Sequence, residues 1–163
     1  MITRVIGIDL GVTAEHQAVV LDPAKGEYLG KPWKFKATPE ALERLIARAQ
    51  QGTTESVQVI AVLEATEMMW YPVGVYLHDH GVEVYRIPGR QTQALRRALW
   101  AHASSDRIDC RVIAKVYTTA AEQLVRWWPP SGEQLALQRL CREYARWREL
   151  SVAIQNRLHA YDH

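Results

Sequence analysis

The segment Val5-Ile6-Gly7-Ile8-Asp9-Leu10-Gly11 lies close to the start of the chain and gives the first strong signal for its fold. Its apolar run predicts a buried strand, because a short apolar segment bounded by turn residues is typical of a strand covered on both faces. A carboxylate at the end of such a strand is costly unless it is paired or bound to a metal ion. Asp9 is therefore the first candidate functional residue.

The next segments predict two more strands. Gln17–Leu21 is a second apolar run, and the turn residues Asp22–Gly26 separate it from a loosely alternating stretch, Tyr28–Lys36. Strands joined by connections this short are usually antiparallel neighbours. The chain is thus expected to open with a three-stranded antiparallel section.

Helices and strands then alternate. Thr38 and Pro39 predict a helix start, because Thr is a good N-cap and Pro suits the first helical position. The expected elements are a helix from Thr38 to Gly52, a strand at Val57–Leu63, a helix at Met68–His80, a strand at Val82–Ile87 and a helix from Pro88 to about Trp100. This order predicts an α/β fold with a mixed five-stranded sheet and flanking helices, which is the element order of the RNase H-like (RuvC-like) fold.

The C-terminal part has a different pattern. A loop at 101–105 and a helix from Asp106 to about Ala121 precede a break, Trp127-Trp128-Pro129-Pro130-Ser131-Gly132, and a long helix is expected from Glu133 onward. We expect residues 1–125 to form one domain and residues 126–163 a linker with a helical arm. Within that arm, residues at alternating three- and four-residue spacing form a seam: Leu137, Leu140, Tyr144, Trp147, Ser151, Ile154 and Leu158. Such a seam predicts a helical hairpin or a coiled coil. It is too apolar for an isolated helix in water, so it either folds back on the first domain or meets another chain. Pairing between chains, as a homodimer or a higher oligomer, is the favoured expectation.

Composition excludes several classes of protein. The chain has 163 residues, of which 48% are hydrophobic and 23% charged, which is typical of a globular protein and not of a disordered one. The two cysteines, Cys110 and Cys141, are too few for a disulfide framework and fit a reducing cytoplasm. No apolar run is long enough to span a membrane, and the N-terminus lacks a signal peptide. A cytoplasmic location without membrane partners is expected.

Charge is distributed unevenly along the chain. Residues 1–85 hold 7 Lys and Arg against 11 Asp and Glu, whereas residues 86–163 hold 13 against 7. Twelve of those 13 cations are Arg, the side chain best suited to bidentate phosphate contacts. The imbalance indicates an anionic partner or, as the alternative, a solvated helical surface. The candidate contacts to a nucleic-acid backbone are Arg96, Arg97, Arg107, Arg111 and Lys115.

Four carboxylates stand at informative positions: Asp9, Glu64, Asp106 and Asp109. Glu64 follows the strand Val57–Leu63, which is expected to lie parallel to the first strand, so that Asp9 and Glu64 meet at one edge. Asp106 and Asp109 are three residues apart and share a helix face. Each carboxylate taken singly is also compatible with a cap or a solvated surface. Together they predict a site for Mg²⁺ or Mn²⁺, with two ions about 4 Å apart for phosphoryl displacement.

These residues carry a family resemblance. The segments Gly7–Gly11, Val62–Thr66 and Ser105–Asp109, with Asn156-Arg157-Leu158-His159 in the long helix, resemble the DEDD-type transposases of bacterial insertion sequences, a group that includes Piv-like invertases and bridge-RNA-guided recombinases. The resemblance implies a RuvC-like domain whose metal ligands are Asp9, Glu64, Asp106 and Asp109. It also implies a DNA substrate and a guide RNA as a further partner.

Two local departures and one larger one stand out. The family's Lys-Thr before the Asp pair is Ser104-Ser105 here, and its Glu-Ala-Thr-Gly is Glu64-Ala65-Thr66-Glu67. Family members also continue into a domain with a serine nucleophile. The printed sequence is therefore expected to be the N-terminal metal-binding domain, incomplete as a recombinase on its own.

Two other functions stay open at this point. The run Asp9-Leu10-Gly11-Val12-Thr13 also fits the first phosphate loop of actin-like and sugar-kinase ATPases, of which the chain would be half. A non-catalytic module that binds nucleic acid and dimerises is the other alternative.

Overall fold

The structure is a computed structural model that describes residues 1–11, 15–64, 69–87 and 106–161, together with positions 89, 92, 94 and 97. At residues 106–109, 123 and 161 it describes the backbone alone. The chain divides into two compact units, Met1–Trp128 and Pro129–His163. Each unit is described by itself below.

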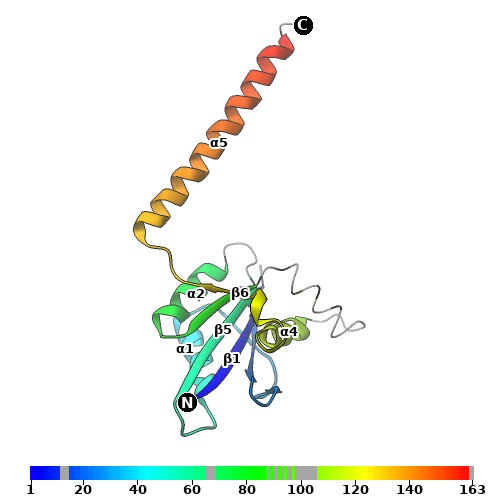
Figure 1. Ribbon diagram of the computed structural model, residues 1–163, viewed down its shortest axis with the longest axis vertical. Coiled ribbons are helices and arrows are strands. Elements are labelled where there is room, and N and C mark those ends of the chain that lie inside the picture. The colour runs from blue at the N-terminus through cyan, green and yellow to red at the C-terminus, as the bar shows by residue number, and fades with distance from the viewer. Residues whose placement is uncertain are drawn as a thin grey trace. The chain divides into compact units, whose positions relative to one another are not determined.

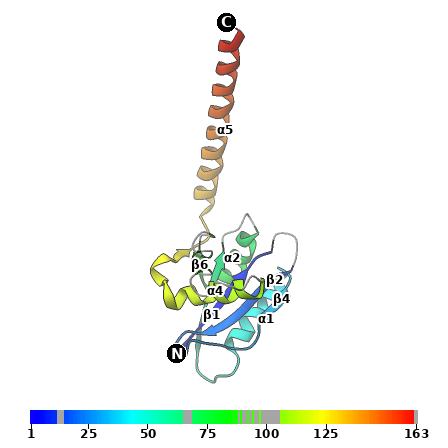
Figure 2. The ribbon, with the colours of Figure 1, turned by 90° about the vertical axis from the view of Figure 1, so that its right-hand side faces the viewer.

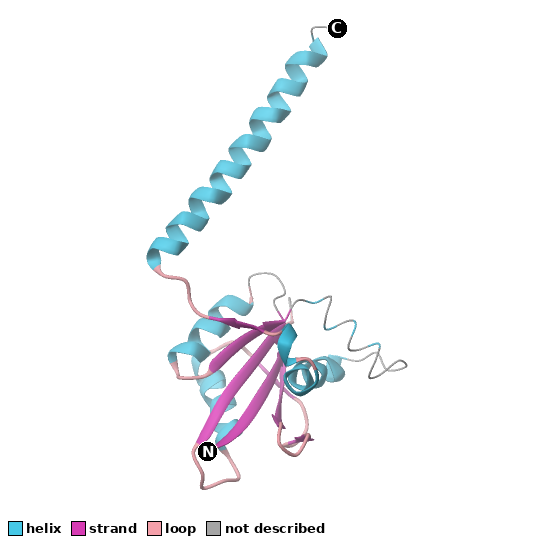
Figure 3. Cartoon of the chain, viewed as in Figure 1, coloured by secondary structure: helices cyan, strands magenta, loops and turns pink. Residues whose placement is uncertain are grey.

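The first unit is an α/β fold with a mixed sheet of seven strands (Figure 3). The strands are β1 (Ile2–Asp9), β2 (His16–Asp22), β3 (Glu27–Tyr28), β4 (Trp33–Phe35), β5 (Val57–Glu64), β6 (Glu83–Ile87) and β7 (Val125–Trp127). Their order is β3-β2-β1-β5-β6-β7, with β4 also paired to β2. The pairs β1–β5 and β5–β6 are parallel, and the other pairs are antiparallel.

Helices cover both faces of the sheet (Figures 1 and 2). α1 (Pro39–Gln50) and α2 (Trp70–Asp79) pack on one face against Ile6, Ile8 and Leu63. α4 (Asp106–Thr119) packs on the other face, and a 3₁₀ turn, η1 (Ala121–Gln123), follows it. Successive residues of β1 and β5 alternate between the two cores, as the period of two in a strand requires.

The predicted helix after Thr38 is confirmed. The hydroxyl of Thr38 accepts a hydrogen bond from the amide of Ala41 at 3.4 Å, and Pro39 occupies the first turn. Gly52 lies just beyond the helix with a φ of 77°, a backbone conformation in which a glycine is favoured because it has no Cβ. The helix buries Leu42 and Leu45 against the sheet.

The sheet has seven strands where the sequence predicts five. The third expected strand, 28–36, is split into β3 and β4 because Gly30, with a φ of 97°, and Pro32 interrupt it. β7 was not expected; its last residue, Trp127, is the first residue of the expected break, and the strand pairs with β6. Trp127 in β7 packs edge-on against Trp70 and lies against α2 at Gly74. The expected helix from Pro88 to Trp100 and the loop 101–105 lie largely outside the described residues.

The second unit contains one long helix, α5 (Gly132–Tyr161), as the sequence predicts. At the start of α5, the hydroxyl of Ser131 accepts a hydrogen bond from the backbone amide of Gln134. Of the helices that the structure describes, none combines the length and apolar character that a membrane span requires.

Candidate metal and nucleic-acid site

Asp9 and Glu64 lie at the same edge of the sheet. They are the last residues of the parallel neighbours β1 and β5, whose register ends with Ile8 opposite Leu63. Asp9 is two residues after Gly7, and Glu64 is two residues after Val62, which belongs to the core under α4. Because side chains alternate along a strand, both half-buried carboxylates lie on the face that α4 covers.

Gly7 allows α4 to pack directly on the backbone of β1. A Cβ at Gly7 would overlap the carbonyl oxygen of Cys110 and lie 2.5 Å from the amide nitrogen of Ala114. Cys110 is fully buried in this contact, and burial raises the pKa of its thiol to about 12, with the nearby negative charge of Asp9 adding to the rise. The beginning of α4 is therefore close to the carboxyl end of β1.

A second glycine lies beside Glu64. A Cβ at Gly89 would come within 2.7 Å of the Oε1 atom of Glu64. The absence of a side chain at this position leaves space for the Glu64 carboxylate at the end of β5.

Asp106 and Asp109 belong to the first turn of α4, but their side chains are outside the described residues. Positions 106 and 109 precede 110 and 113 by one helical turn, and Cys110 and Ile113 are buried against the sheet. Among the side chains that the structure does describe, no group of three or more Asp, Glu, His or Cys could hold a metal ion. The described part of the predicted ligand set is thus Asp9 and Glu64.

The predicted basic contacts are placed differently from one another. Arg111 and Lys115 are half-buried on α4, one turn apart, and the guanidinium of Arg111 lies 5.4 Å from the ring centroid of Tyr28. Arg97 is exposed. Arg107 is described by its backbone only, and Arg96 lies outside the described residues.

Two polar residues near Asp9, Gln17 and Lys34, were not among the residues predicted from the sequence. Gln17 of β2 is paired with Asp9, and Lys34 of β4 is paired with Gln17. The signal for them is the antiparallel register between β1, β2 and β4, which no local pattern in the sequence reveals.

Comparison with known protein families shows to which family the chain belongs. A family model described as transposase, the DEDD transposase of insertion sequence IS110, matches residues 6–161. The chain belongs to the IS110-type DEDD transposase family. Membership supports a general role in DNA transposition or recombination, with DNA as a partner, and it disfavours the ATPase alternative. No curated protein matches this transposase sequence.

Proposed function

We propose that residues 1–125 form an RNase H-like, RuvC-like domain that acts on phosphodiester bonds of DNA through a divalent-metal site of Asp9, Glu64, Asp106 and Asp109. The observation that carries the proposal is the position of Asp9 and Glu64 at adjoining parallel strand ends, on the face where α4 begins. Carboxylate oxygens are the ligands that Mg²⁺ and Mn²⁺ prefer.

The donor set fits such ions. Two carboxylates on neighbouring strands and two at the start of one helix concentrate negative charge. A cation bound between them would offset the repulsion of the carboxylates for one another. When bound there, two Mg²⁺ ions would stabilise the charge that develops on a scissile phosphate. The chain's own residues position the metal ligands and the DNA. Packing of α4 on Gly7 places the start of α4 near the strand ends, and Arg111 and Lys115 supply cations for backbone phosphates.

The test compares thermal unfolding with and without Mn²⁺, in the presence and absence of DNA. A ligand at a hundredfold excess over its Kd stabilises the folded state by about 2.7 kcal/mol. With an unfolding entropy of about 0.27 kcal/mol/K for a unit of this size, the Tm should rise by about 10 °C. Asp9→Asn should abolish the rise.

The matched control is Asp79→Asn, since Asp79 is an exposed carboxylate in the last turn of α2. This variant should keep the full response to Mn²⁺. A wild-type Tm that Mn²⁺ leaves unchanged even with DNA present, or an Asp9→Asn variant that still responds, would contradict the metal site.

We further propose that residues 126–163 act as a linker and a dimerisation arm, through a coiled coil of α5. Six seam residues are exposed in this single-helix unit: Leu137, Leu140, Tyr144, Trp147, Ile154 and Leu158. Tyr144 and Trp147 are each 70% exposed, and fully burying one such side chain contributes about 1.5–3 kcal/mol. A second chain in register would bury the seam.

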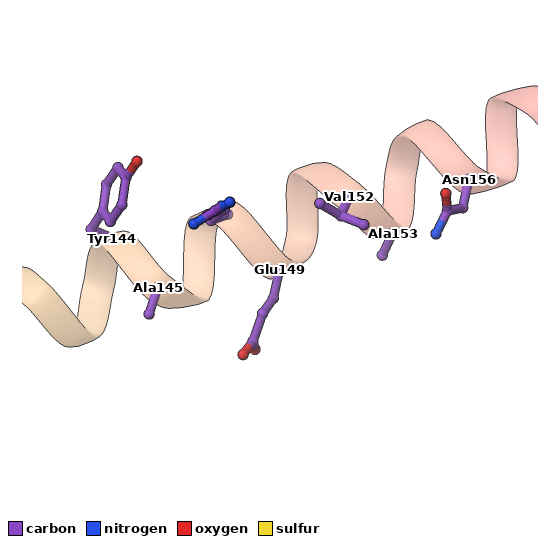
Figure 4. A pocket seen from close by; sticks show the side chains of 7 residues that line it. Tyr144, Ala145, Glu149, Val152, Ala153 and Asn156 are labelled. Carbon is purple, nitrogen blue, oxygen red and sulfur yellow. The ribbon is translucent and has the colours of Figure 1, made fainter.

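Beside the seam lies an open hollow whose described lining residues all belong to α5 (Figure 4). It includes Ala145, Val152 and Asn156, and it shares Tyr144 with the seam. Trp147→Glu with Ile154→Glu should convert a dimer to a monomer in light scattering, whereas Ala145→Glu with Asn156→Glu, which adds the same charge off the seam, should not. A monomeric wild type would refute the dimer. Dissociation by the control pair and not by the seam pair would indicate that the interface is at the hollow instead of the seam.

A further inference from the structure

A basic hollow lies on the β2 and β4 side of Asp9. Its volume is about 550 Å³, and the described residues that line it are Gln17, Lys31, Pro32, Lys34 and Arg111. Three of the five are cations, and none is acidic. The hollow is therefore suited to an anion and not to a metal ion.

Strand register places this hollow beside the carboxylate edge. Gln17 is the partner of Asp9 across β1 and β2, and Lys34 is the partner of Gln17 across β2 and β4. Directly paired residues present their side chains on the same face of a sheet. Because neighbouring strands are about 4.8 Å apart, Lys34 is roughly 10 Å from the strand that carries Asp9.

The two lysines of the hollow make few interactions within the described part of the chain. Lys31 is exposed and has no ion pair there, and Lys34 has one exposed ion pair, with Glu15 at 3.6 Å. An exposed pair of this kind contributes at most about 1 kcal/mol and can be exchanged for another anion.

Tyr28 fixes the position of Arg111 through two contacts. The hydroxyl of Tyr28 donates a hydrogen bond of 2.9 Å to the backbone carbonyl of Arg111, and the same ring lies under the guanidinium. The Nε atom of Arg111 is buried without a hydrogen-bond partner among the described atoms. Gln17, itself buried, adds an amide that can donate to a phosphate oxygen.

We infer that this hollow binds a backbone phosphate of the DNA strand whose scissile phosphate lies at Asp9, which makes it a positioning site. The inference rests on the proposed function. The separation of roughly 10 Å between Lys34 and the strand that carries Asp9 spans few nucleotides, so the phosphate in the hollow lies close to the reacting phosphate along the same DNA strand. Contacts of this kind set the register of the strand without reading its sequence.

The test measures binding of a fluorescein-labelled DNA duplex by anisotropy over a range of salt concentrations, with EDTA present so that the metal site does not contribute. Each phosphate contact adds about 0.9 to the slope of log K against log salt. Lys31→Gln with Lys34→Gln removes the one phosphate contact of the hollow and should make the slope less steep by about 0.9. The same titration with a duplex RNA is run in parallel.

The control is Lys25→Gln with Arg44→Gln, which removes the same charge elsewhere. Lys25 is in the turn after Asp22, at the opposite end of β2 from Gln17, and Arg44 is exposed on α1, on the other face of the sheet. The control should retain the wild-type slope.

Equal slopes for the hollow variant and the wild type would overturn the inference and leave the proposed function intact. A change seen with RNA but not with DNA would overturn the assignment to DNA. A wild-type chain that binds no DNA at low salt would overturn the inference and the proposed function together.

Discussion

Replacing Gly7 with alanine tests the contact that brings α4 to the candidate site. The new Cβ would overlap the carbonyl oxygen of Cys110 and meet the amide nitrogen of Ala114 at 2.5 Å. Both atoms are helix backbone, so the conflict cannot be relieved by a side-chain rotation. Overpacking typically costs 1–3 kcal/mol, and a clash with backbone belongs at the upper end, about 3 kcal/mol.

The size of the thermal effect follows from the size of the unit. Residues 1–128 form the unit, and at about 2.1 cal/mol/K per residue its unfolding entropy is about 0.27 kcal/mol/K. A loss of about 3 kcal/mol should therefore lower the Tm by about 11 °C in differential scanning calorimetry. Because α4 must move away from β1, the stabilisation by Mn²⁺ should also fall.

The control substitution is Gly132→Ala, at the first residue of α5, where a Cβ would meet nothing within 4 Å. It should change stability by less than about 1 kcal/mol. A Gly7→Ala variant that melts within about 2 °C of the wild type would show that α4 does not lie against the backbone of β1.

Two further predictions concern stability. Burial alone would raise the pKa of Asp22, but the hydrogen bond and charge of buried Arg4 outweigh this effect and lower that pKa. The pair should therefore stabilise the fold above about pH 4 and lose this contribution as the pH falls through the lowered pKa. Asp22→Asn should cost about 3–5 kcal/mol in urea unfolding at pH 7, and less when it is combined with Arg4→Met. Trp127→Ala should cost about 2–3 kcal/mol because Trp127 packs on α2, whereas Trp128→Ala, at a side chain 57% exposed, should change stability by less than about 0.5 kcal/mol.

The parts of the fold with strong local signals could be predicted from the sequence. The apolar runs that became β1 and β5 and the cap at Thr38 are local, and the parallel pairing of β1 and β5 follows from the order of the elements. β7 could not be predicted in this way. It has three residues, of which Val125 and Arg126 are exposed, and it gains its strand character from pairing with β6, far earlier in the chain.

The candidate site shows the same division. Asp9 and Glu64 could be placed together because each ends a strand of a parallel pair. Gln17 and Lys34 could not be placed beside Asp9, since a shift of one residue in the register of β2 would turn both side chains to the other face. A glycine inside a buried strand does indicate close backbone approach, so Gly7 carried a usable signal for the packing of α4.

The proposed metal site can be tested directly by a crystal structure of the chain with Mn²⁺, with anomalous data collected at the manganese edge. We expect anomalous density at the carboxyl ends of β1 and β5, with oxygens of Asp9 and Glu64 as ligands together with those of Asp106 and Asp109. Manganese bound only elsewhere, or a fully ordered carboxylate edge with no anomalous density at millimolar Mn²⁺, would contradict the proposed metal site.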